Sequence, residues 1–180
     1  MFIGAETRLT AGFGQAEARL AQLIRGGLLG RASGGAYDQW RTALARDGPW
    51  GNAPWGTALG TSRLARVQVR DTAAHRDLAI WPLRWEVTGP HGTLVPVLDA
   101  DITLTPAGAD ASLLAVLAVC RPPLGGLAAG LDQALVRRCA TAMIQAFTHH
   151  IAAAITHPAA SPGARHDRIL ADDRPEPETP

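Results

Sequence analysis

The chain has 180 residues, 47% of them hydrophobic, and a formal net charge of +1. This length and composition allow one domain with a substantial core and exclude a chain that is disordered over most of its length. The near-neutral charge gives no field that would recruit nucleic acid or an anionic lipid surface. All 17 basic residues are arginines, which excludes a phosphate-loop lysine and a Schiff-base lysine.

The first sixty residues predict one short strand and two helices. Residues 2–10 are read as a short strand, and residues 13–29 carry apolar side chains at helical spacing. The glycine-rich stretch "GGLLGRASGG" then interrupts this pattern. Ser33 is expected to cap a second helix over residues 35–46, and the following "DGPWGNAPWG" is typical of a loop.

Four strands joined by short turns are predicted next, at residues 63–71, 78–88, 93–105 and 111–120. Consecutive strands with short connections favour an antiparallel sheet. The first three alternate apolar and polar residues, whereas the last is apolar on both faces. Pro82 lies in the middle of the second strand and has no amide to donate, which indicates an edge strand or a bulge.

A long helix is predicted to follow the last strand. Arg121-Pro122-Pro123 ends that strand, because proline cannot continue its hydrogen bonding and restricts the residue before it. An apolar stripe begins at Leu124 and continues for about 32 residues, or ~48 Å of helix, and the concave side of a curved sheet would cover it. Residues 158–180 are rich in Pro, Asp, Arg and Glu and are expected to form a disordered tail after a domain spanning 1–157.

This order of elements resembles the helix-grip fold of the SRPBCC superfamily. The superfamily includes START domains, polyketide cyclase/dehydrase-like proteins and the major birch pollen allergen, and the chain is most similar to uncharacterised actinobacterial members. The resemblance covers about residues 78–138, in "WPLRWEVTGPHG", "PVLDADITLTPAG" and "RPPLGGLAAGLDQALVRR". It implies an α+β fold in which a curved antiparallel sheet wraps around a long C-terminal helix, with two short N-terminal helices. The superfamily usually has around six strands in the interval where this sequence shows four, which predicts either a smaller sheet or a partly opened grip.

The resemblance also implies a ligand cavity between the sheet and the long helix. Apolar side chains from two strands and from the helix would line it, unless they simply fill a core. The cavity-lining candidates are Trp81, Leu83, Trp85, Leu98, Ala100, Ile102, Leu127, Leu131 and Leu135. Polar groups at the cavity mouth would come from Arg84, Asp99 and Arg121.

No residue pattern identifies a catalytic centre, a metal site or a cofactor. Asp99 and Asp101 are predicted on the strand face opposite the apolar set, where they form either paired carboxylates or a solvent-exposed surface beside arginines. His149 and His150 are adjacent on a helix and point about 100° apart, so they are poorly placed to share a metal ion. Cys120 and Cys139 lack the spacing of a metal or redox pair and are expected to be buried thiols in a reducing cytosol.

The sequence therefore predicts a cytoplasmic protein that binds a hydrophobic small molecule or lipid and does not bind nucleic acid. No secretory signal begins the sequence, and no apolar run is long enough for stable membrane insertion. One alternative is a polyketide cyclase/dehydratase-like enzyme, which needs an acid–base side chain inside the cavity. The other is a protein–protein interaction module without a ligand. The ligand and the oligomeric state are left open.

Overall fold

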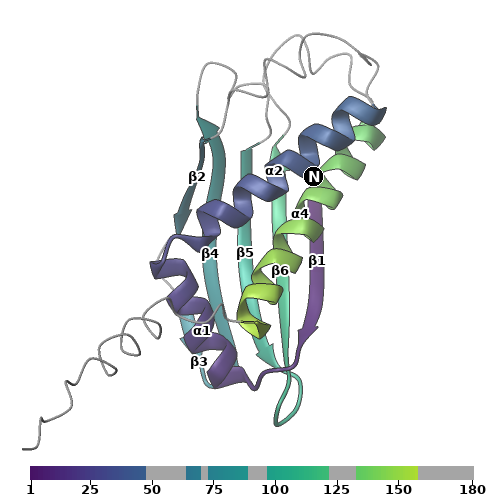
Figure 1. Ribbon diagram of the computed structural model, residues 1–180. Helices are drawn as coiled ribbons and strands as arrows, with labels where there is room; N and C mark the ends of the chain where they lie inside the picture. Colours follow the sequence, from purple (N-terminus) through teal and green to yellow (C-terminus); the bar gives the residue numbers. More distant parts are fainter. Residues whose placement is uncertain (48–63, 70–72, 89–96, 122–132, 158–180) are drawn as a thin grey trace, which may run out of the picture.

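The computed structural model describes residues 1–47, 64–69, 73–88, 97–121 and 133–157 (Figure 1). The chain begins with a strand and two helices, continues through five strands within the described residues, and ends in a long helix. The elements are β1 (Phe2–Leu9), α1 (Phe13–Arg25), α2 (Leu28–Asp47), β2 (Leu64–Val69), β3 (Ala73–His75), β4 (Leu78–Thr88), β5 (Val97–Pro106), β6 (Ser112–Arg121) and α4 (Gln133–Thr156).

The strands form one antiparallel sheet in the order β1-β6-β5-β4-β2, with β3 pairing to β4 on the same side as β2. The helices pack on one face of this curved sheet: α4 contacts β1 and β6, and α2 contacts β2 (Figure 1). Helices α2 and α4 also pack along each other. This arrangement is the predicted α+β helix-grip architecture, with the sheet holding the C-terminal helix against its inner face.

The inner face of the sheet is built from rows of apolar side chains that run across the strands. The register places Trp85, Leu98 and Cys120 in one row and Trp81, Ile102 and Val116 in another, all of them buried. Phe147 of helix α4 packs against these rows, and its ring centroid lies 5.6 Å from that of Trp85. Fully burying a large apolar side chain stabilises a fold by about 1.5–3 kcal/mol, so these rows fix α4 on the sheet.

Two helix boundaries in the sequence prediction are wrong, the end of the first helix and the start of the second. The first predicted helix, over 13–29, ends at Arg25, and the second begins at Leu28 and not near residue 35. Ser33 is therefore inside α2 and not at its cap; its hydroxyl donates to the carbonyl of Leu29 at 2.6 Å. A glycine in a helix costs about 1 kcal/mol relative to alanine, a cost that packing of α2 against α4 overrides.

The sheet also differs from the prediction around Pro82. Strand β4 is an interior strand, because β5 pairs with it on one side and both β2 and β3 pair with it on the other. On that second side, β3 pairs as far as Ile80 and β2 pairs from Leu83 onward, so Pro82 falls at the break between them. Strand β3 has only three residues, too few to give a recognisable alternation.

Several predicted features lie outside the described residues. These are the start of the long helix at Leu124, the loop after α2, the first residues of the strand predicted at 93–105, and the tail at 158–180. The described part of α4 is 24 residues long, and the described part of β6 ends at Arg121, immediately before the two prolines.

Two glycine substitutions test this account of the fold. A Cβ atom at Gly34, inside α2, would meet nothing within 4 Å, so Gly34→Ala should raise the free energy of unfolding by about 0.5–1 kcal/mol through helix propensity. A Cβ atom at Gly12, before α1, would lie 2.9 Å from the Ala109 carbonyl oxygen, so Gly12→Ala should lower it. Urea unfolding followed by circular dichroism measures both. A destabilised Gly34→Ala variant would contradict the placement of Gly34 in a helix.

Candidate functional site

The predicted cavity-lining side chains on β4 and β5 all point to the inner face and are buried. Trp81 and Leu83 are each 4% exposed and Ile102 is fully buried, as part of one continuous core. From α4, Leu135 belongs to the same core, while Leu127 and Leu131 lie outside the described residues. A side chain that lines a wide empty cavity keeps accessible surface within it, so the described part of the interior is closely packed.

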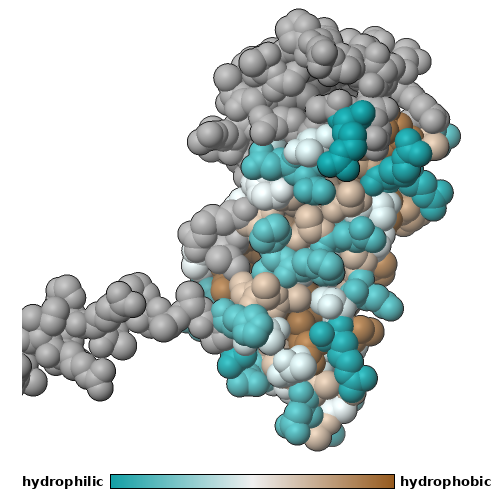
Figure 2. Space-filling model, turned by 45° about the vertical axis from the view of Figure 1, so that its right-hand side comes forward, coloured by the Kyte–Doolittle hydropathy of each residue, from teal (hydrophilic) through white to brown (hydrophobic). Residues whose placement is uncertain are grey.

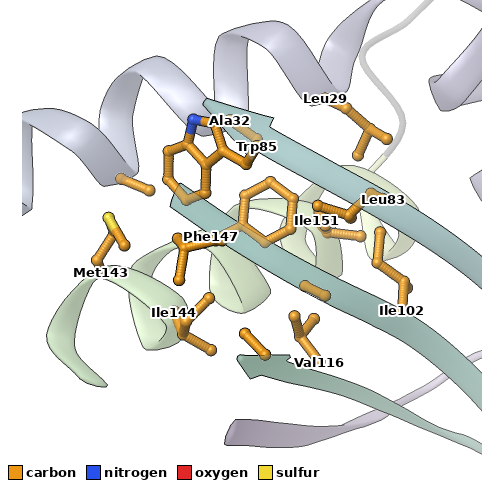
Figure 3. Close-up of a cluster of buried hydrophobic side chains, with 14 of the residues drawn as sticks. Leu29, Ala32, Leu83, Trp85, Ile102, Val116, Met143, Ile144, Phe147 and Ile151 are labelled. Atoms are coloured by element: carbon orange, nitrogen blue, oxygen red, sulfur yellow. The ribbon is translucent and has the colours of Figure 1, made fainter. Parts of the chain in front are cut away.

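Two indole N–H groups in this core have no hydrogen-bond acceptor within the described structure. They belong to Trp85 on β4 and Trp40 on α2, and the two residues are 3% and 1% exposed. Figure 3 shows the Trp85 indole beside the Phe147 ring, with its nitrogen on the side of α2. A buried donor without an acceptor costs about 1–3 kcal/mol, and native cores contain few of them. Within the described interior, these two donors are indole groups whose hydrogen-bonding capacity is unused.

The other polar groups in the described interior are neutral. Ser33, Ser112 and Thr148 are buried, and each hydroxyl donates to a backbone carbonyl at 2.6–2.9 Å. Tyr37 contributes a phenol to the same core. No carboxylate, imidazole or guanidinium is among the buried side chains that the structure describes. The described interior therefore offers hydrogen bonds and apolar contact, and no strong acid or base.

The three predicted polar residues come together, but on the outer face of the sheet, away from α4. Asp99 Oδ2 lies 2.7 Å from Arg121 Nη2, and Asp99 Oδ1 lies 3.6 Å from Arg84 Nη1. Arg84 Nε also lies 3.6 Å from Glu86 Oε2. Arg84 faces Asp99 directly across β4 and β5. Asp101 is exposed on the same face, so both aspartates point outward as predicted.

A hollow of about 740 Å³ lies over this outer face. Its described lining comes from β1, β4, β5 and β6 and combines apolar side chains with the charged group just described. Figure 2 views the opposite side of the molecule, where the helices lie; its coloured part shows hydrophilic residues mixed with small hydrophobic patches in brown. The lining residues that point outward are Phe2, Pro82, Arg84, Asp99, Asp101, Leu117, Val119 and Arg121, with Gly4 between them.

The histidines of α4 do not enter the core. His149 and His150 are exposed, and His150 donates from Nδ1 to the Ala146 carbonyl at 2.7 Å while its ring lies against Gly35 of α2. Within the described ranges, no three His, Cys, Asp or Glu side chains gather closely enough to hold a metal ion. None of the described helices is both long and apolar enough to cross a membrane.

No family model matches the chain, and no curated protein matches it. Solved structures of similar architecture include a conserved protein from Geobacillus kaustophilus, at 15% identity and a TM-score of 0.48, covering 86% of this chain and 95% of that one. They also include a Streptomyces aromatase/cyclase, at 11% identity and a TM-score of 0.35, covering 86% and 95%. Norcoclaurine synthase from Thalictrum flavum, in complex with dopamine and hydroxybenzaldehyde, has 11% identity and a TM-score of 0.32, covering 83% and 84%. At identities of 11–15% these likenesses do not bear on what this chain binds.

The thiol of Cys120 should be inert in the folded protein. Burial raises its pKa from the ordinary value of 9.0 to about 11, partly opposed by the nearby N-terminal ammonium. Since the folded-state pKa is the higher one, this group's contribution to stability is complete below pH 9 and is lost as the pH rises toward 11. We expect no alkylation of Cys120 by iodoacetamide at pH 8 until the protein is unfolded. Mass spectrometry of the alkylated peptides measures this, and rapid labelling of the native protein would contradict the burial.

Proposed function

We propose that this protein binds a hydrophobic small molecule or lipid between the sheet and the C-terminal helix, and that the ligand carries a hydrogen-bond acceptor. The site would lie around Trp85 and Leu98, next to Leu135 in the first turn of α4. The predicted lining residues Leu127 and Leu131 precede Leu135 in the sequence and would complete it. A carbonyl, ether or phenolic oxygen on the ligand would accept from the indole N–H of Trp85.

The unsatisfied indole donors carry this proposal. Packing a tryptophan where its N–H has no acceptor is unfavourable, and a phenylalanine of similar shape would avoid the cost at Trp85. A ligand that brings an acceptor recovers this cost on binding. Such a ligand can therefore open the packing around Trp85 at a lower cost in free energy than the purely apolar packing elsewhere in the core. The stacked Phe147 ring and the flexible Met143 side chain provide an adaptable apolar environment for the aromatic or aliphatic part of a ligand.

Binding is favoured over catalysis by the chemistry of the described interior. The cyclase/dehydratase alternative requires an acid or base that faces the substrate, and the carboxylates of Asp99 and Asp101 are on the opposite face of the sheet. An interaction module without a ligand would leave the buried indole donors without an acceptor. We further propose a cytoplasmic location, membership of the SRPBCC superfamily near its actinobacterial members, and a domain spanning residues 1–157 followed by a tail at 158–180.

The test compares ligand binding by Trp85→Phe with that of the wild-type protein. The substitution keeps an aromatic ring beside Phe147 and removes only the N–H donor and part of the ring. We expect binding about 5–10-fold weaker, the equivalent of one hydrogen bond, in fluorescence titrations with quinones, aromatic polyketides and fatty acids. The free energy of unfolding should change by about 1 kcal/mol or less, because the loss of ring area is offset by removal of the unsatisfied donor.

Trp81→Phe is the matched control, since Trp81 lies two residues earlier on the same strand face and its nitrogen is not among the buried donors without an acceptor. It removes the same ring area without removing an unsatisfied donor, so it should weaken binding clearly less than Trp85→Phe does. Equal affinities for the wild-type protein and Trp85→Phe would contradict the assigned hydrogen bond. The absence of binding to every class in the panel would contradict the proposed function itself.

A further inference from the structure

Strand β6 is apolar on both faces, although helices cover only one face of the sheet. Its inward residues, among them Leu114 and Val116, are fully buried in the core. Its outward residues before Arg121 are also apolar, and Leu117 is 59% exposed. In antiparallel sheets with one free face, that face is normally polar. The outer face of β6 is therefore built like a surface that another protein covers.

The exposed apolar surface continues onto β1. Phe2 is 81% exposed, and Phe2 and Leu117 are the two large hydrophobic side chains exposed among the described residues. Both point to the outer face and line the hollow. The Leu117 side chain lies over Gly4, its partner in the register, because a Cβ atom on Gly4 would come 2.8 Å from Leu117 Cδ2. Phe2, Gly4, Leu117 and Val119 form the apolar half of this face, which we name the β1–β6 patch.

The charges beside the β1–β6 patch are of both signs. Arg84 and Arg121 lie with Asp99 between them, and Asp101 lies one row further along β5 with no ion pair among the described residues. A face with one dominant charge would repel a second copy of itself. A face with interspersed charges can be complementary to its own copy, as a two-fold symmetric interface requires.

We propose that the outer face of the sheet is a dimer interface, and that a second copy of this chain covers the β1–β6 patch. The register defines two neighbouring rows across the face, one with Phe2, Val119, Asp99 and Arg84, and one with Gly4, Leu117, Asp101 and Pro82. Each row is apolar on β1 and β6 and carries an aspartate on β5.

The size of the face is consistent with a reversible dimer. Four strands about 4.8 Å apart and roughly 27 Å long present about 500 Å² in each copy. The pair would bury on the order of 1,000 Å², near the lower limit for a specific interface, which indicates association in the micromolar range. This interface is independent of the interior ligand site, since the two lie on opposite faces of the sheet.

Sedimentation velocity of the full chain between 1 and 200 µM tests the proposal. The wild-type protein should shift from monomer to dimer across this range. Phe2→Ser and Leu117→Thr should each weaken dimerisation at least tenfold, while Arg138→Ser, an exposed change on α4, should leave it unchanged. Both patch residues are exposed, so unchanged thermal unfolding of the variants should accompany the loss of dimer.

Three results would overturn the proposal. The first is a monomer at every concentration. The second is a dimer that neither Phe2→Ser nor Leu117→Thr weakens, which would place the interface elsewhere. The third is a monomer whose β1–β6 patch is protected from hydrogen exchange only when residues 158–180 are present, which would make the chain's own tail the cover.

Discussion

Burial of α4 against the inner face of the sheet is the interaction on which the rest of the structure depends. The helix buries ten of its described residues, and the Trp85–Phe147 stack joins it to β4. Helix α2 packs on both α4 and β2, so its position depends in part on that of α4. Because the contact between α4 and the sheet occupies the apolar inner face, any ligand that enters the grip must compete with it. In that competition, a ligand with an acceptor for the indole N–H of Trp85 gains a hydrogen bond, which apolar packing cannot supply.

The two faces of the sheet have different chemistry, and this separates their roles. The inner face is apolar and neutral in its described part, with unsatisfied donors at Trp40 and Trp85. The outer face holds the charged group around Asp99 next to exposed apolar residues on β1 and β6. The carboxylates of Asp99 and Asp101 lie on the outer face, away from the interior between the sheet and α4. The proposed binding function inside and the proposed association outside both rest on this alternation of residues.

The longer strands and their face assignments could be predicted from the sequence, because an alternation with a period of two indicates directly which side chains point inward. The three-residue strand β3 was too short to be predicted. Trp81, Leu83 and Trp85 are buried and Arg84 is outside, as that pattern indicated. The start of α2 could not be predicted, since its glycines oppose a helix locally and only packing against α4 stabilises it. The position of Arg84, Asp99 and Arg121 relative to a cavity mouth was equally out of reach. Alternation places them on the outer face, but which residues surround that face depends on pairing between β1 and β6, far apart in the sequence.

The most direct test of the central claim, an apolar ligand with a hydrogen-bond acceptor inside the helix grip, is native mass spectrometry of the protein purified from its own host. The account predicts a stoichiometric small molecule bound to the folded chain. Denaturation should release it, and its formula should contain oxygen in a mainly hydrocarbon skeleton. A protein that is consistently empty, and that shows no thermal shift with lipids, quinones or aromatic polyketides, would contradict the claim.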